Sequence, residues 1–198
     1  YNGGVVVDRE RDGHRKLIYV KRLPSDVFEE IVVFSKEMEI NLVCCMCEEK
    51  GGLLKEEYRH SLAGTELKLF GGPGFVHDRN LHEKILKNEL MSPPKLMLIT
   101  GESERDRVLG EVRKRWGQRI YATWSIPDRI EIMPLCVNKS KSLIALVDLV
   151  GIGIDEVLAI GDGENDIPML NMAGQGILMG NADTIVRRGV EDSSVSIG

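Results

Sequence analysis

The chain has 198 residues, of which 42% are hydrophobic and 29% charged, and this balance is typical of a globular protein with a substantial core. Its 26 Lys and Arg against 31 Asp and Glu give a net charge of -5, without a basic cluster of the kind that binds nucleic acid or anionic membranes. No apolar run approaches a membrane span, and the N-terminus lacks the layout of a signal peptide. We therefore expect a cytoplasmic protein with a small diffusing partner, and neither nucleic acid nor membrane as partner.

The first part of the chain predicts a hairpin followed by two β-α units. The β-rich stretches 4–7 and 16–20 flank a polar segment whose Asp12-Gly13 step favours a hairpin turn. A helix is expected to start at Pro24 and Ser25, with Ser25 as N-cap. The later predicted elements are an apolar strand from 42 to 46, a polar helical segment from 80 to 88, a strand from 95 to 100, an amphipathic helix from 102 to 116 and a strand from 119 to 123.

Cys44 and Cys47 have the Cys-x-x-Cys spacing that redox and zinc sites also use. They lie in an apolar run that predicts a buried strand, and no second pair follows to complete four zinc ligands. Free cysteine is among the most buried residue types. The pattern therefore favours buried structural thiols, which also suit a reducing compartment.

The final third alternates strands and helices with short connections, which is typical of a parallel sheet covered by helices. The predicted elements are an apolar helix from 143 to 150, a buried strand from 157 to 160, a helix from 167 to 172, a strand from 177 to 179, a helix from 182 to 188 and a strand from 195 to 197.

An acidic loop follows the predicted buried strand in this region and reads Gly161-Asp162-Gly163-Glu164-Asn165-Asp166. Ligands of open α/β sheets bind outside the carboxyl ends of the strands, so the loop lies where chemistry is expected. Asp162 and Asp166 supply the hard oxygens that Mg²⁺ prefers, and the positive N-terminus of the following helix points back at the site. A metal-bound phosphate would be stabilised there.

Two other loop types share part of this pattern. The dinucleotide fingerprint needs a third glycine where Asp166 stands, and that acid would repel a pyrophosphate lacking a metal. The calcium loop needs glycine at its sixth position, where Ile167 stands. An acidic loop that merely faces solvent is the remaining alternative, and its place between a buried strand and a helix disfavours it.

The loop resembles the fourth motif, Gly-Asp-x-x-Asn-Asp, of the haloacid dehalogenase-like superfamily, and specifically its Cof-like sugar-phosphatase branch with a type IIB cap. Upstream, the run 129–134 followed by Asn138-Lys139-Ser140 looks like the approach to the third motif, whose lysine would be Lys139. Downstream, the stretch 176–180 with Asn181-Ala182 is similar to the next strand and its Gly-Asn-Ala turn. The opening Asn2-Gly3-Gly4 resembles the step by which these proteins leave the core.

The resemblance implies an α/β fold with an incomplete Rossmann-like parallel-sheet core and an inserted α/β cap domain. Residues 1–22 would be a core remnant, a hairpin leading to the cap. Residues 23–128 would form the cap, and residues 129–198 the core with the metal-binding motif.

The resemblance also implies a Mg²⁺-dependent phosphatase that acts on a small phosphorylated metabolite through an aspartyl-phosphate. Asp162 would be a Mg²⁺ ligand, and Asp166 a second ligand or an acid behind the ligands. Asn165 would orient the nucleophile region and the phosphate, and Lys139 would neutralise the phosphoryl oxygens. Asn181 is a weaker candidate for the phosphate site, since a Gly-Asn turn is also ordinary turn chemistry.

The family's nucleophile and its acid-base partner come as Asp-x-Asp, and no two aspartates of this sequence stand two residues apart. We therefore expect the nucleophile to lie upstream of Tyr1, and the chain alone to be inactive. Two other hypotheses stay open: a catalytically inactive fragment or binding module of this fold, and the phosphorylation unit of a cation-pumping ATPase. The second has a similar Gly-Asp-Gly-x-Asn-Asp motif, but it would need membrane spans and an Asp-Lys-Thr segment.

Overall fold

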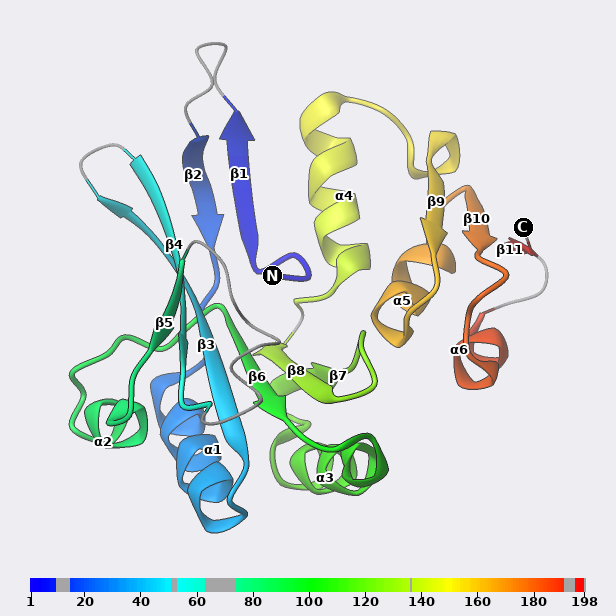
Figure 1. Cartoon of the computed structure of the whole chain (residues 1–198). Helices are drawn as coiled ribbons and strands as arrows, with labels where there is room; N and C mark the ends of the chain where they lie inside the picture. Colours follow the sequence, from blue (N-terminus) through cyan, green and yellow to red (C-terminus); the bar gives the residue numbers. More distant parts are fainter. Residues whose placement is uncertain (10–14, 51–52, 63–73, 136, 191–194, 198) are drawn as a thin grey trace.

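Two larger sheets, each with its own helices, and a small hairpin make up the described part of the chain (Figure 1). The computed structural model describes residues 1–9, 15–50, 53–62, 74–135, 137–190 and 195–197. The sheets have six and three strands, and the predicted α/β fold is confirmed. Within these residues no helix has both the length and the apolar character needed to cross a membrane.

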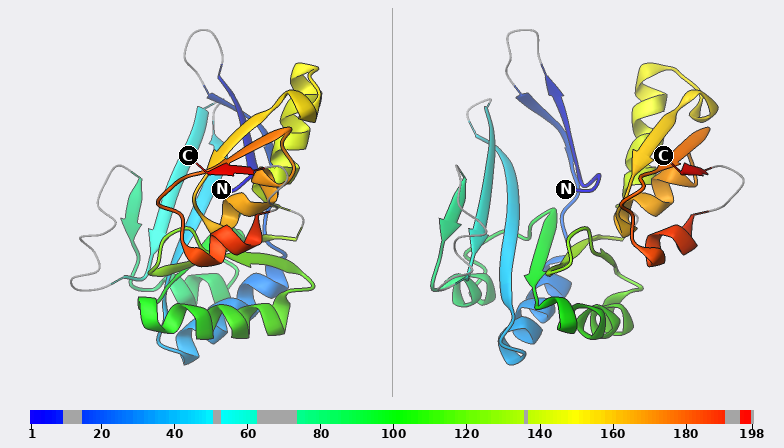
Figure 2. Two further views of the ribbon diagram at one scale, coloured as in Figure 1. Left: turned by 90° about the vertical axis from the view of Figure 1, so that its right-hand side faces the viewer. Right: turned by 45° about the vertical axis from the view of Figure 1, so that its right-hand side comes forward.

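The hairpin consists of β1 (Val5–Arg9) and β2 (Arg15–Val20), which pair antiparallel as predicted. The Asp12-Gly13 step lies outside the described residues. The right-hand view of Figure 2 shows the hairpin between the long strands of the six-stranded sheet and the helix that starts the second unit. Gly3, just before β1, has a φ of +97°, and a Cβ there would lie 1.5 Å from Ser142 Oγ of that helix. Only glycine allows this close approach.

The six-stranded sheet is covered on one face by three helices. Its strand order is β5-β4-β3-β6-β8-β7, mostly antiparallel, with β5 parallel to β4. The strands are β3 (Asn41–Lys50), β4 (Leu53–His60), β5 (Phe75–His77), β6 (Lys95–Ile99), β7 (Ile120–Thr123) and β8 (Arg129–Pro134). The helices are α1 (Ser25–Glu37), α2 (Leu81–Leu86) and α3 (Glu102–Trp116).

Most elements of this unit agree with the sequence expectations, and α3 has the predicted bounds. The N-cap of α1 differs from the prediction, because Pro24 holds that position and Ser25 is the first residue of the helix. No side-chain hydrogen bond caps this end of the helix. Strands β4 and β5 were not predicted. Strand β4 carries many charged residues and is held by its long pairing with β3, from Val43 opposite His60 to Lys50 opposite Leu53.

Strand β3 is buried on both faces, which explains its run of apolar residues. Leu42 and Cys44 pack into the core beneath the helices, while Val43 and Cys45 pack into a smaller cluster on the opposite face. Cys44, Cys45 and Cys47 are buried free thiols. Burial raises the pKa of Cys44, and raises the pKa of Cys45 to about 11. The prediction of structural thiols for Cys44 and Cys47 is therefore confirmed.

The strand at residues 129–134 was expected in the core segment, but it belongs to the six-stranded sheet. Strand β8 begins at Arg129, and it pairs with β6 and β7 inside the six-stranded sheet. The expected boundary after residue 128 therefore cuts this sheet before its last strand. Backbone pairing between Leu96 and Ile132 and their neighbours joins β8 to the preceding unit.

The second unit is a three-stranded parallel sheet with helices, as predicted. Its strands are β9 (Leu158–Gly161), β10 (Gln175–Leu178) and β11 (Val195–Ile197), in the order β11-β10-β9. Its helices are α4 (Lys139–Val150), α5 (Ile167–Leu170) and α6 (Thr184–Gly189), with short 3-10 turns η2 (Ile154–Glu156) and η3 (Glu164–Asp166).

Helix α4 and strand β9 differ most from expectation. Helix α4 begins at Lys139 rather than at residue 143, because the Asn138 side chain accepts a hydrogen bond from the Lys141 amide at 3.0 Å and caps the helix. The buried strand predicted at 157–160 is buried only on alternate residues. Strand β9 is at the edge of the described sheet, where Leu158 and Ile160 are 52% and 54% exposed.

Candidate active site

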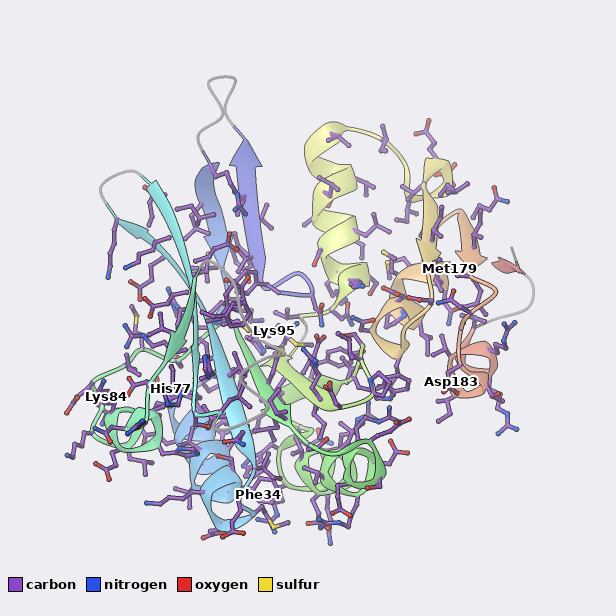
Figure 3. The ribbon with its side chains drawn as sticks, in the orientation of Figure 1. Phe34, His77, Lys84, Lys95, Met179 and Asp183 are labelled. Carbon is purple, nitrogen blue, oxygen red and sulfur yellow. The ribbon has the colours of Figure 1, made fainter. Side chains whose placement is uncertain are left out.

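Three segments of the second unit meet at the carboxyl end of β9. They are the acidic loop of residues 162–166, the first residue of α4, and the turn between β10 and α6. In Figure 3, the labelled Met179 and Asp183 stand on either side of that turn, and Lys95 marks the six-stranded sheet across from it. The segments expected from the sequence to form one site are therefore brought together.

Asp166 organises the loop. Its Oδ2 atom accepts hydrogen bonds from the backbone amides of Asp162 and Gly163, both at 3.1 Å. Its Oδ1 atom accepts a hydrogen bond from the Lys139 ammonium. Asp166 is only 6% exposed, so burial of this charge is offset by an opposite charge and two amide donors.

Gly161 and Gly163 are required by the close approach of these side chains. A Cβ at residue 161 would lie 2.5 Å from Asp166 Cβ, and one at residue 163 would lie 2.6 Å from Asn165 Oδ1. Both glycines therefore allow the Asp166 and Asn165 side chains to fold back over the start of their own loop.

Replacing Gly161 with alanine is expected to displace Asp166 and to lower the free energy of unfolding by about 1–3 kcal/mol, as overpacking does. Gly110 in α3 is the matched control, because a Cβ there meets nothing within 4 Å. Gly110→Ala should instead raise stability by about 0.4–1 kcal/mol. Urea denaturation of both variants measures the difference, and an unchanged midpoint for Gly161→Ala would contradict this account of the loop.

The other predicted site residues occupy different depths. Asp162 is exposed, and its Oδ2 atom accepts a hydrogen bond of 2.7 Å from Asn181 Nδ2. Asn165 is 5% exposed and lies against Gly163. The Lys139 side chain is 32% exposed, so its ammonium contacts Asp166 from a position still open to solvent.

The donor set of this loop fits a magnesium ion held largely by water and a bound anion. Among the residues the structure describes, no group of three or more His, Cys, Asp or Glu side chains could hold a metal ion by itself. Mg²⁺ is usually bound through one or two carboxylates and keeps several waters or phosphate oxygens. Asp162 and Asp166 are the carboxylates that would hold it, and Asp162 is the more open of the two.

Glu164 belongs to the same loop, and no sequence pattern predicts its role. Its carboxylate accepts hydrogen bonds from Arg113 Nη2 at 3.0 Å and Thr123 Oγ1 at 2.8 Å, both in the six-stranded unit. These partners lie 51 and 41 residues away along the chain, beyond the reach of any local pattern.

A buried carboxylate on β8 is a second feature whose contacts the sequence did not predict. Glu131 is 4% exposed and accepts hydrogen bonds from Lys95 Nζ at 2.6 Å, Asn2 Nδ2 at 2.5 Å and Ser125 Oγ at 2.9 Å. Burial raises its pKa, but the Lys95 ammonium and these hydrogen bonds outweigh burial and hold the pKa below its usual value. Asn2 thereby ties the start of the chain to the six-stranded sheet.

Comparisons with known proteins show which family this chain resembles. A family model described as haloacid dehalogenase-like hydrolase matches residues 1–190. The chain is 38% identical over 89 residues to the 5-amino-6-(5-phospho-D-ribitylamino)uracil phosphatase of Bacillus subtilis, which covers 45% of this chain and 35% of that protein. It is 39% identical over 66 residues to the HMP-PP phosphatase of an Enterobacter species, which covers 33% of this chain and 24% of that protein.

Solved structures share the fold at low sequence identity. A haloacid dehalogenase-like hydrolase from B. subtilis matches with a TM-score of 0.75 at 18% identity, over 99% of this chain and 72% of that chain. A sugar phosphatase of subclass IIB matches with a TM-score of 0.72 at 18% identity, over 99% of this chain and 68% of that chain. The matches to the two curated relatives span between about a quarter and about a third of their length. The chain belongs to the haloacid dehalogenase-like hydrolase family.

Proposed function

We propose that the full-length protein containing this chain is a Mg²⁺-dependent phosphatase that hydrolyses a small phosphorylated metabolite through an aspartyl-phosphate. One observation carries the proposal: Lys139 and the two acids Asp162 and Asp166 meet at the carboxyl end of a parallel strand. This is where open α/β sheets bind their ligands. An ammonium beside a carboxylate pair can hold both a dianionic phosphate and the cation that accompanies it.

Different residues of this chain would bind the phosphate, orient it and hold the cation. Lys139 would place its ammonium against the phosphoryl oxygens, while Asp166 keeps that ammonium in position. Asn181 would orient Asp162, whose outer oxygen stays open to a cation. Asn165 would face the nucleophile region and the phosphate. A bound Mg²⁺ would offset the negative charge that gathers on the phosphoryl group.

We place the nucleophile in a segment outside this sequence, on a strand beside β9. Among the described strands β9 is at the sheet edge, and its residues Leu158 and Ile160 present apolar side chains to solvent. A parallel strand paired to that edge would place its own side chains beside these two on the same face of the sheet. The carboxyl ends of neighbouring parallel strands meet at one edge of a sheet, so its last residues would lie beside Asp162.

The six-stranded unit would act as the cap, with β8 as its last strand. Cap residues would then run from about 23 to 134, and the core of this chain would comprise the hairpin at 1–22 and the segment from residue 137 onward. The named phosphatases among the relatives support a small phosphorylated metabolite as substrate, and the sugar phosphatase among the solved structures makes sugar phosphates the first class to test. A cytoplasmic location is part of this proposal.

The test compares the full-length protein with the present chain. The full-length protein should hydrolyse p-nitrophenyl phosphate with Mg²⁺ and stop in EDTA, whereas the 198-residue chain should be inactive. Asp162→Asn in the full-length protein should lower kcat/KM by on the order of a hundredfold. Hydrolysis that is equally fast in EDTA would overturn the metal assignment. A full-length protein that binds phosphorylated metabolites without hydrolysing them would favour the alternative, an inactive binding module of this fold.

A further inference from the structure

Glu164 connects the acidic loop to the six-stranded unit rather than to the proposed metal site. One carboxylate oxygen accepts a hydrogen bond from Arg113 Nη2 at 3.0 Å. The other accepts from Thr123 Oγ1 at 2.8 Å and from the Trp124 backbone amide at 3.3 Å. We call this set of bonds the Glu164 contact. It joins the turn that carries Asp166 to helix α3 and the end of strand β7.

The donors of the Glu164 contact are held in place by other parts of the six-stranded unit. Arg113 donates from Nε and Nη2 to the Ala122 carbonyl oxygen, at 3.0 and 2.8 Å. Thr123 is fully buried. The Arg105 guanidinium lies 3.9 Å from the centre of the Trp124 ring, which fixes the residue whose amide donates to Glu164. The donors are therefore each positioned by further contacts within the six-stranded unit.

Burial makes this contact more than a surface ion pair. Exposed ion pairs contribute little to stability. The Arg113 side chain is 45% exposed, so a pair with Arg113 alone would contribute little. The Glu164 side chain is only 18% exposed and takes two further donors from buried positions. Loss of the carboxylate would leave the Thr123 hydroxyl buried without this acceptor, which is costly.

A shift of Glu164 would reach the proposed metal site directly. Glu164, Asn165 and Asp166 form a single 3-10 turn, closed by a 2.9 Å hydrogen bond from the Asp166 amide to the Gly163 carbonyl oxygen. Asp166 in turn holds Lys139 and the amides of Asp162 and Gly163. The turn is therefore anchored on one side by α4 and on the other by the six-stranded unit.

We propose that Glu164 is a positioning residue whose contact with Arg113 and Thr123 couples docking of the six-stranded unit to divalent cation binding by the loop. This inference rests on the proposed function, because it assumes that Asp162 and Asp166 bind a cation. Coupling between two sites is reciprocal. Docking should therefore strengthen cation binding, and the cation should in turn stabilise the docked arrangement.

The experiment uses four variants of the full-length protein. Glu164→Gln removes the charge but keeps an acceptor, Arg113→Met removes the cation, and Thr123→Val removes one hydroxyl at nearly constant size. Arg107→Met is the matched control, since Arg107 lies on the same helix but pairs with Glu104 rather than with the loop. Calorimetric Mg²⁺ titration measures the affinity for the cation. The rate of hydrogen exchange in peptides covering 120–124 and 161–167 reports whether the six-stranded unit is docked on the loop.

The first three variants should each weaken Mg²⁺ binding by about fivefold or more, and Arg107→Met should leave it unchanged. In the wild-type protein Mg²⁺ should slow exchange in peptide 120–124, and this effect should disappear in Glu164→Gln. A double variant Glu164→Gln/Arg113→Met should lose no more affinity than the worse single variant, because both changes break one contact. In kinetic measurements, the Mg²⁺ concentration that gives half-maximal activity should rise, while kcat at saturating Mg²⁺ should change little.

Two results would overturn the inference. One is Mg²⁺ affinity within experimental error of wild type in all three variants, provided that the wild-type protein binds the cation. The other is additive losses in the double variant, which would mean that the two residues act independently. Neither depends on turnover. A protein that hydrolyses no phosphate ester but shows the coupled Mg²⁺ and exchange effects would support the Glu164 contact and refute the proposed function.

Discussion

Glu131→Gln is expected to lower the free energy of unfolding by about 3–5 kcal/mol, because removing one partner of a buried ion pair leaves the other charge uncompensated. Glu131 is 4% exposed, and the Lys95 side chain that it pairs with is 12% exposed, so the remaining ammonium would have little access to water. Glutamine keeps the size but only one acceptor oxygen, whereas Asn2 donates to Oε2 and Ser125 donates to Oε1 of Glu131. The loss therefore includes one hydrogen bond as well as the charge. Urea denaturation with an unchanged m-value measures it.

Two controls separate this pair from an ordinary surface contact. Glu111→Gln breaks a pair with Arg115 whose side chains are 39% and 49% exposed, and should change stability by less than about 1 kcal/mol. Lys95→Met/Glu131→Gln should be more stable than Glu131→Gln alone, because no unpaired charge stays buried. A double variant less stable than both single variants would contradict the assignment of Lys95 as the partner.

The pH dependence of the Glu131 effect follows from the direction of its pKa shift. The folded-state pKa is held below the ordinary value of 4.5, mainly because Lys95 and the hydrogen-bond donors outweigh burial. Its contribution to stability is therefore fully present above pH 4.5 and is lost as pH falls through the lower folded value. The stability difference between wild type and Glu131→Gln should shrink in that acid range.

Asp166→Ala is expected to cost about 2–4 kcal/mol of stability and to remove Mg²⁺-dependent activity from the full-length protein. The change takes away the acceptor of the Asp162 and Gly163 amides and the partner of Lys139. Asp166→Asn keeps one oxygen for the amides, so it should cost only about 1–2 kcal/mol. Both variants should lose at least about a hundredfold in kcat/KM.

Asp148→Asn is the control for this experiment, because Asp148 is exposed on α4, the helix that also carries Lys139. It should change stability by no more than about 0.5 kcal/mol and leave activity intact. Thermal and urea denaturation, with kinetics on the same samples, separate folding from chemistry. Full activity in Asp166→Asn would remove Asp166 from the proposed site.

The helices and the acidic loop were predictable because their signals are local. Helix α3 has the predicted bounds, since its apolar residues recur at helical spacing over fifteen positions. The loop was identified from glycines and acids that stand within six residues, and the glycines are required by contacts with Asn165 and Asp166 of the same loop. Strand β4 was missed, because its charged residues give no apolar pattern and only pairing with β3 makes it a strand.

The sequence by itself determined the fold class, the parallel unit at the C-terminal end and the place of the acidic loop after β9. Only the tertiary structure decided which sheet β8 joins, which face of β9 stays open, and that Glu164 reaches Arg113 and Thr123. The physical reason is the range of the interactions involved. Helical periodicity and turn chemistry act within a few residues, whereas strand pairing and burial depend on segments brought together from distant parts of the chain.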